Sequence, residues 1–204
     1  MNISNESNSN KSILDDLSKD TVIFISGTPC TGKTTVAANL NDYLSENGFD
    51  SKLIKINDFA IENDLVLGED PDKFYKIIDI DGLNESLNEE IDQNSNCILI
   101  VEGHLSHLCE GADKMIVLRL NPSILKGRLE ERNYSASKIQ ENLEAEALAV
   151  CSAEAYEIYG DEVSEIDASN KSIEEIRDLI LSIATGNLEC PVGSIDYMEW
   201  LLNQ

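Results

Sequence analysis

A glycine-rich segment near the start of the chain carries the pattern of a phosphate-binding loop. Residues 27–34 read GTPCTGKT, which fits GxxxxGK[ST]. Gly27 and Gly32 permit backbone conformations that a Cβ atom would obstruct, so successive N–H groups can point at phosphate oxygens. Lys33 can reach the β- and γ-phosphates of a nucleotide, and the Thr34 hydroxyl can ligate Mg²⁺. The segment predicts that the chain binds ATP and Mg²⁺ and moves or hydrolyses the terminal phosphate.

A carboxylate follows a second apolar run, where such an enzyme needs one. Residues 97–101 read CILIV, and Glu102, Gly103 and His104 come next. The carboxylate in this place holds Mg²⁺ or orients the attacking group, so Glu102 is a candidate metal and catalytic residue. His104 is expected to position a water or a phosphate, or else to donate a hydrogen bond in a turn. With His107 it makes an HxxH pattern, which lacks the further ligands of a metal site.

Two arginines are spaced to act together. Arg128 and Arg132 lie four residues apart on a predicted helix and therefore share one face. They are candidates for clamping the phosphates as charge spreads in the transition state. The alternative is a pair of surface charges balanced by Glu130 and Glu131. The polar segment that follows, residues 133–141, suits a small lid that excludes water when it closes.

The elements that must position these side chains alternate between strand and helix. Apolar runs predict strands at 22–26, 52–56, 97–101, 115–120 and 163–168. Helical spacing predicts helices at 33–44, 123–132 and 138–159, and another from Ser172, which forms a capping box with Glu175. Residues 58–94 are expected to be mostly helical, with breaks at Pro71 and Gly82. The order predicts an α/β P-loop NTPase fold, with a parallel sheet of about five strands flanked by helices.

Length and composition fit one domain with an ordinary core. The chain has 204 residues, of which 42% are apolar. Residues 1–20 form a polar tail, with a short helix expected near 13–17. There is no run of ~20 apolar residues, so no transmembrane helix and no membrane association are expected. The start of the chain lacks the basic and apolar stretches of a signal peptide, so we expect a cytoplasmic location. Five cysteines without a CxxC pair are expected to be reduced thiols.

The strong negative charge limits the partners. The formal net charge is −24, and only four arginines are present. Direct binding of free nucleic acid is not expected, because that affinity comes from Lys and Arg side chains on phosphates. The charge either keeps the surface solvated or favours a basic protein partner. A Ras-like GTPase is disfavoured because residues 170–173, NKSI, lack the aspartate of NKxD.

Five segments, taken in order, resemble adenylate kinase isoenzyme 6 in its archaeal form: ISGTPCTGKTT, INDFA, VEGH, RLNPSILKGRLEERNY and NLEAEA. The VEGH and LxxRLxxRxY elements are more discriminating than the P-loop. The resemblance covers residues 21–184. It implies a P-loop kinase domain over that range, with a segment at about 56–79 that binds a nucleoside monophosphate (NMP) and a lid at about 131–141. Residues 185–204 would be a C-terminal extension.

The resemblance also implies an activity and a partner. Members of that family are similar to broad-specificity NMP kinases that hydrolyse ATP. They assist late maturation of the small ribosomal subunit and its rRNA through transient contact with a platform ribosomal protein. Carried over residue by residue, the ATP site comprises Cys30, Gly32, Lys33, Thr34, Thr35 and Arg132, and Glu102 and His104 match the family's carboxylate-x-His element. Together with the analysis of the residues above, the cofactor site also includes Gly27, the catalytic candidates are Lys33, Glu102, His104, Arg128 and Arg132, and the substrate-binding candidates are Asp58 and Arg119.

Two departures from the family pattern bear on the activity. Glu102 stands where the family often has Asp, and Ile61 stands where an Arg commonly follows the DLA-like element. The second change removes a cation for the NMP phosphate, for which Arg119 is a candidate substitute. Two alternatives therefore remain beside the kinase: an assembly factor that uses ATP as a switch with negligible NMP kinase activity, and a P-loop kinase of a small metabolite.

Overall fold

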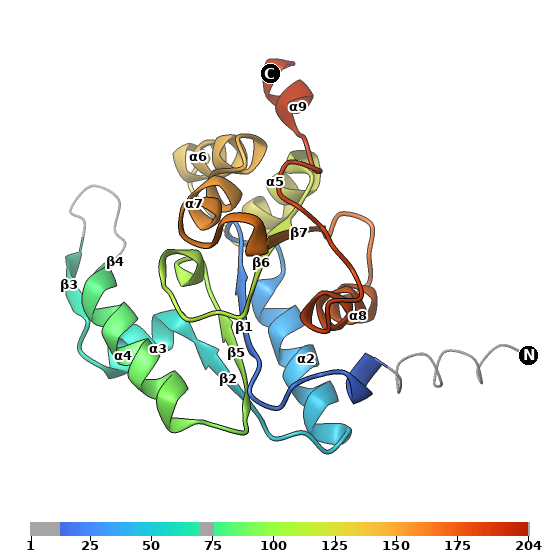
Figure 1. Ribbon diagram of the computed structural model, residues 1–204. Helices are drawn as coiled ribbons and strands as arrows, with labels where there is room; N and C mark the ends of the chain where they lie inside the picture. Colours follow the sequence, from blue (N-terminus) through green and yellow to red (C-terminus); the bar gives the residue numbers. More distant parts are fainter. Residues whose placement is uncertain (1–12, 70–75, 204) are drawn as a thin grey trace, which may run out of the picture.

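The computed structural model describes residues 13–69 and 76–203 and is built on one parallel sheet (Figure 1). The sheet has five strands in the order β2-β5-β1-β6-β7. They are β1 Val22–Ser26, β2 Ser51–Lys55, β5 Ile98–Glu102, β6 Lys114–Arg119 and β7 Val163–Asp167. This confirms the α/β P-loop NTPase fold, and each observed strand overlaps its predicted one. Central β1 pairs with β5 and with β6, so the carboxyl ends of these three strands meet at one edge.

Helices cover both faces of the sheet, which explains why β1 is apolar at nearly every position (Figure 1). Ile23 and Ile25 pack in one core with α2, α5, α6 and α8, whereas Val22 and Phe24 pack in the other with α3, α4 and α7. The helices are α2 Lys33–Glu46, α3 Ile56–Glu62, α4 Ile80–Gln93, α5 Pro122–Glu131, α6 Ala136–Ala147, α7 Val150–Tyr159, α8 Ile173–Ala184 and α9 Met198–Leu202. Two 3₁₀ turns, η1 Ser106–Leu108 and η2 Gly160–Glu162, complete the set for the described residues.

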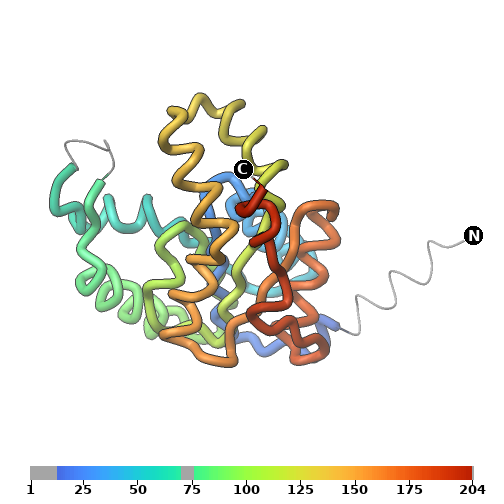
Figure 2. The backbone as a smooth tube through the Cα atoms, turned by 90° about the horizontal axis from the view of Figure 1, so that it is seen from above, coloured from blue at the N-terminus to red at the C-terminus, as the bar shows by residue number. Residues whose placement is uncertain are grey.

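The expectation of mostly helix at 58–94 is wrong in its middle part. An antiparallel hairpin, β3 Val66–Glu69 with β4 Lys76–Ile78, separates α3 from α4. Gly82 does not break the structure, because it lies in the first turn of α4 and donates its N–H to the capping side chain of Asp79. The expected break at Pro71 lies outside the described residues. Figure 2 shows the hairpin side and the α5–α6 pair projecting from the sheet as two separate arms.

The single helix expected at 138–159 is two helices. α6 ends at Ala147 and α7 begins at Val150, and between them Ala149 has a left-handed conformation with φ 54°. Alanine disfavours that conformation, so no local signal in the sequence predicts the break. The capping box of Ser172 and Glu175 at the start of α8 is confirmed.

Both ends of the described chain pack on the domain. Residues 13–15 are helical, and Leu14 and Leu17 are buried against the core of α2 and α8, so this end of the polar tail is not loose. At the other end Pro191 forms an isolated bridge with Ser164 of β7, and α9 contacts α6. Over 13–69 and 76–203, no helix combines the length and apolar character needed to cross a membrane.

Candidate active site

The loop between β1 and α2 has the shape that its glycines predict. Gly27 has φ 137°, and a Cβ atom there would lie 2.4 Å from the carbonyl oxygen of Leu118. Gly32 caps α2 in a left-handed conformation with φ 110°. Cys30 also has a positive φ, 70°. The loop is therefore a cradle that side chains at the two glycines would distort, and the N-terminal end of α2 opens into it.

Lys33 lies across this loop. Its Nζ donates to the carbonyl oxygens of Gly27 at 2.8 Å and Thr28 at 2.9 Å. The side chain is buried, and burial lowers its pKa from the ordinary value, although Cys151 and Glu102 partly offset this. A cation held by main-chain carbonyls with little access to water is well placed to exchange them for phosphate oxygens.

The first turn of α2 and the end of β5 bring a hydroxyl and a carboxylate together. The Thr34 Oγ1 donor lies 3.1 Å from both Oε1 and Oε2 of Glu102. Ile25 pairs with Glu102 across β1 and β5, which fixes the carboxylate beside the loop. Among the described residues no three His, Cys, Asp or Glu side chains gather as a metal cage. One hydroxyl and one carboxylate fit Mg²⁺, which takes few protein ligands and completes its shell with water and substrate phosphates.

The two histidines after β5 have different surroundings. His107 is 1% exposed and bridges β1 to α7: Nδ1 lies 2.6 Å from Ser26 Oγ and Nε2 lies 2.8 Å from Glu154 Oε2. Burial lowers the pKa of His107 and outweighs the effect of Glu154. Burial and the Lys33 charge likewise lower the pKa of His104. Both ring nitrogens of His107 are engaged, which argues against an HxxH metal site.

The structure brings one of the two arginines to the loop. The Nη1 of Arg128 lies 3.3 Å from the carbonyl oxygen of Cys30 and 3.4 Å from that of Thr31. Arg132 caps the end of α5 and is exposed. Thr35 is also exposed, in the first turn of α2. Of the two arginines that were predicted to act together, Arg128 therefore contacts the loop and Arg132 does not.

The two candidates for substrate binding lie elsewhere. Arg119 is fully buried and bonds to Glu146 and Glu165, at 2.9 Å and 2.5 Å, so its guanidinium does not face the loop. Asp58 is exposed on α3, and Ile61 on the same helix is 44% exposed. From its sequence context Arg119 is a cation at the end of a strand, and no local pattern indicates its partners, because they lie 27 and 46 residues further along the chain.

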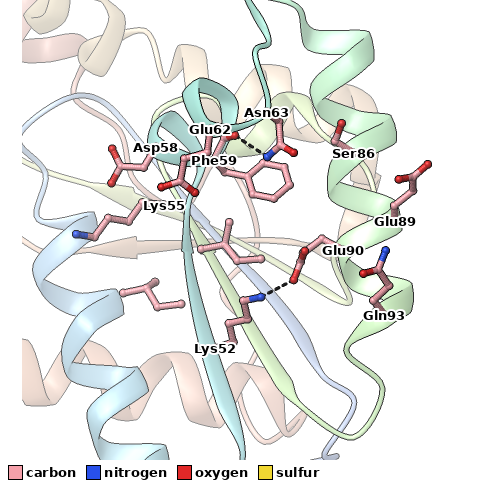
Figure 3. A pocket seen from close by; sticks show the side chains of 12 residues that line it. Lys52, Lys55, Asp58, Phe59, Glu62, Asn63, Ser86, Glu89, Glu90 and Gln93 are labelled. Carbon is pink, nitrogen blue, oxygen red and sulfur yellow. Dashed lines mark hydrogen bonds and ion pairs between the residues drawn. The ribbon is translucent and has the colours of Figure 1, made fainter.

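An open groove of about 670 Å³ lies apart from this site, along edge strand β2 between α3 and α4 (Figure 3). Asp58 and Phe59 of α3 line it, and the ion pair of Lys52 with Glu90 spans it at 2.5 Å. None of its lining residues belongs to the loop at 27–35. The groove is therefore separate from the glycine-rich loop.

Comparison with known proteins identifies relatives over nearly the whole chain. A family model described as "AAA domain" matches residues 23–149. A protein of Methanothermobacter thermautotrophicus named "Putative adenylate kinase" is 43% identical, covering 89% of this chain and 99% of the relative. Proteins with the same name from Archaeoglobus fulgidus and Methanococcus maripaludis are 39% and 37% identical, covering 88% and 87% of this chain and 93% and 96% of the relatives.

Solved structures share the fold at low sequence identity. A tunicamycin resistance protein of Deinococcus radiodurans superposes with a TM-score of 0.53 at 12% identity, covering 84% of this chain and 98% of that one. The shikimate kinase of Bacteroides thetaiotaomicron gives 0.51 at 13% identity, covering 79% and 96%. At these identities the likeness supports the fold alone.

Proposed function

The chain belongs to the family of these archaeal proteins named "Putative adenylate kinase", and from that membership we propose that it is a nucleotide kinase of the P-loop class. It transfers the γ-phosphoryl group of ATP to a nucleoside monophosphate, with broad specificity for the base. The observation that carries this proposal is the meeting of Thr34 and Glu102 beside the loop that Lys33 crosses.

The loop and its neighbours have separate roles in this proposal. Main-chain N–H groups of the loop, including those of Cys30 and Thr35 but not of Pro29, which has none, bind the phosphates. Lys33 leaves its two carbonyl partners for the β- and γ-phosphates. Thr34 and Glu102 would hold Mg²⁺, which would supply positive charge against the phosphates. His104, kept neutral by its lowered pKa, positions the attacking group.

The remaining parts close over the nucleotides. Arg128, already on the loop carbonyls, and Arg132, on the adjoining lid at about 131–141, stabilise charge on the transferred group. The segment at about 56–79 takes the monophosphate, with Asp58 on its exposed helix face. Arg119 would reach a substrate only by exchanging its buried carboxylate partners. We therefore expect it to contribute less to substrate binding than Asp58.

Two finer roles follow from the resemblance to the isoenzyme 6 family. The chain hydrolyses ATP and assists late maturation of the small ribosomal subunit in the cytoplasm. Its transient partner is a basic ribosomal protein of the platform, which the net charge of −24 would attract. No role for free nucleic acid is proposed.

A second candidate rests on Ile61, the exposed apolar residue on α3 where the family pattern has a cation. If no residue binds the monophosphate strongly, ATP hydrolysis acts as a switch for assembly and phosphoryl transfer is incidental. A P-loop kinase of a small metabolite is the remaining alternative.

ATP turnover by the purified protein separates these functions. The assay contains Mg²⁺ with and without each monophosphate, and it resolves ADP from free phosphate. ADP that depends on a monophosphate, without free phosphate, establishes the kinase. Free phosphate whatever monophosphate is present supports the switch. No turnover of ATP in either condition would reject both, and a screen of small-metabolite acceptors would follow.

A further inference from the structure

A buried carboxylate behind the phosphate-binding loop joins three parts of the candidate site. Glu146 of α6 accepts from Thr28 Oγ1 at 2.5 Å through Oε2. Its Oε1 accepts from the main-chain N–H of Leu120, at 3.0 Å, at the junction of β6 with α5. α5 in turn carries Arg128, which contacts the loop. Glu146 is 1% exposed, so water does not compete for these bonds.

Arg119 binds this carboxylate inside the protein. Its Nε bonds to Glu146 Oε1 at 2.9 Å and its Nη2 to the Glu146 carbonyl oxygen at 2.7 Å. Its Nη1 reaches Glu165, which also accepts from Ser152 Oγ at 2.6 Å. Burial opposes the charge of Arg119, but the two carboxylates outweigh it and hold the pKa of Arg119 above its ordinary value. Removing one partner of such a buried pair is costly, because it leaves the other without compensation.

The bond from Thr28 is the part of this network that reaches the loop. The Thr28 carbonyl oxygen accepts from Lys33 Nζ at 2.9 Å and from Thr31 Oγ1 at 2.9 Å. When Lys33 moves to the phosphates, the loop loses two of its internal bonds, one at Gly27 and one at Thr28. The side chain of Thr28, 2% exposed, stays tied to Glu146 from behind.

We propose that Glu146 is a positioning residue that holds the loop open for phosphate through Thr28, with Arg119 holding Glu146 in turn. This rests on the proposed function, because it assumes that ATP binds the loop. α6 begins inside the proposed lid, so the same carboxylate links lid movement to the shape of the loop. The role of Arg119 is then to position Glu146. Its presence at the end of β6 needs no contact with the substrate to explain it.

The test removes one hydroxyl at a time. Thr28→Val deletes the bond to Glu146 at nearly constant volume, and Thr28→Ser restores a hydroxyl. Tyr159→Phe is the matched control, because it deletes a part-buried bond from the Tyr159 hydroxyl to the carbonyl oxygen of Cys109 and touches neither the loop nor Glu146. ATP affinity is measured by calorimetry with the full chain, KM and kcat are measured by turnover, and melting temperature is recorded for each variant.

The loss of one hydrogen bond to a charged group corresponds to roughly 10- to 100-fold in an equilibrium constant. We expect Thr28→Val to weaken ATP binding and raise KM by at least about tenfold, with kcat changed far less. Thr28→Ser should recover most of the affinity. Tyr159→Phe should lower the melting temperature and leave ATP affinity unchanged.

Two results overturn the inference. One is a Thr28→Val protein that melts lower but binds ATP as the parent does. The other is an equal loss of ATP affinity in Tyr159→Phe, which would make the effect one of general stability. A parent protein that binds no ATP would instead reject the proposed function, and this inference with it.

Discussion

The Thr34 hydroxyl is equidistant from the two carboxylate oxygens of Glu102, 3.1 Å from each. One residue comes from the first turn of α2 and the other from the end of β5, 68 residues later. Two oxygen-bearing side chains that could ligate a metal, one from a helix and one from a strand, therefore lie on the same side of the loop. Glu is one methylene longer than Asp, and here its carboxylate reaches the Thr34 hydroxyl directly.

Glu102→Gln should weaken the use of Mg²⁺. The amide keeps the shape of the side chain but removes the negative charge that attracts the cation. We expect the Mg²⁺ concentration for half-maximal turnover to rise by about tenfold or more. Glu130→Gln, an exposed position on α5, is the control and should leave the titration unchanged. An unaltered Mg²⁺ curve in Glu102→Gln would remove Glu102 from the metal site.

Lys33→Ala should lower turnover by about 10²-fold or more, since the loss of a preorganised charge stabiliser has costs of that order. The measurement is ATP turnover at saturating ATP and Mg²⁺. Lys52→Ala serves as the comparison, because Lys52 is exposed and its ion pair with Glu90 contributes little. Near-native turnover in Lys33→Ala would show that the site is assigned wrongly.

Two glycines predict opposite effects of the same substitution. Gly27→Ala would place a Cβ 2.4 Å from a backbone oxygen at a φ that alanine rarely adopts. We therefore expect the free energy of unfolding to fall by more than about 1 kcal/mol and ATP binding to be lost. Gly127→Ala meets nothing within 4 Å inside α5 and should stabilise the fold by about 0.5–1 kcal/mol. Denaturant unfolding measures both; a stable, ATP-binding Gly27→Ala protein would contradict the cradle.

The buried histidine predicts how stability depends on pH. The pKa of His107 is lowered in the folded protein, so the unfolded chain takes up its proton first as the pH falls. Stability from this group is therefore complete above the ordinary value of about 6.5 and is lost as the pH falls from there toward the folded pKa. Urea unfolding at pH 7 and pH 5.5 should give a smaller difference for His107→Gln than for the parent. Equal differences would mean that His107 takes up its proton at its ordinary pKa in the folded protein.

Ile61→Arg tests where the monophosphate binds. If the exposed face of α3 lines that site, the new guanidinium should lower the KM for AMP by roughly three- to tenfold, since it supplies a charge-assisted hydrogen bond to phosphate. Ile158→Arg, at an exposed position on α7, adds the same charge elsewhere and should leave that KM unchanged. Equal effects of the two variants would point to the overall charge rather than to a site on α3.

The sequence was sufficient for elements whose signals are local. The loop, the strands on either side of it and the capping box depend on short patterns around Gly27, Glu102 and Ser172, and these patterns predict them. The hairpin β3–β4 was missed because two short strands carry weak periodicity inside an acidic, mostly helical stretch. The break at Ala149 was missed because neither glycine nor proline marks it.

The surroundings of individual charges could not be predicted in the same way. Arg119 at the end of β6 has the sequence context of a ligand-binding cation, and only the tertiary structure pairs it with Glu146 and Glu165. His107 likewise showed only an HxxH pattern, whereas its partners Ser26 and Glu154 lie 81 residues before and 47 residues after it. The burial of a side chain depends on the assembled core, so it can be predicted from a single sequence only indirectly.

The contact between Thr28 and Glu146 spans 118 residues of the chain. A ribosome delivers the chain from its amino terminus, so the loop at 27–35 is synthesised long before the residue that braces it. Glu165, and Gly193 which donates to it at 3.0 Å, appear later still. A nascent chain therefore holds the whole phosphate-binding motif but lacks its support, and a fragment cut before α6 would carry the motif without the activity. If Glu146 supports the loop as proposed, competence to use ATP is acquired only after α6 has been synthesised.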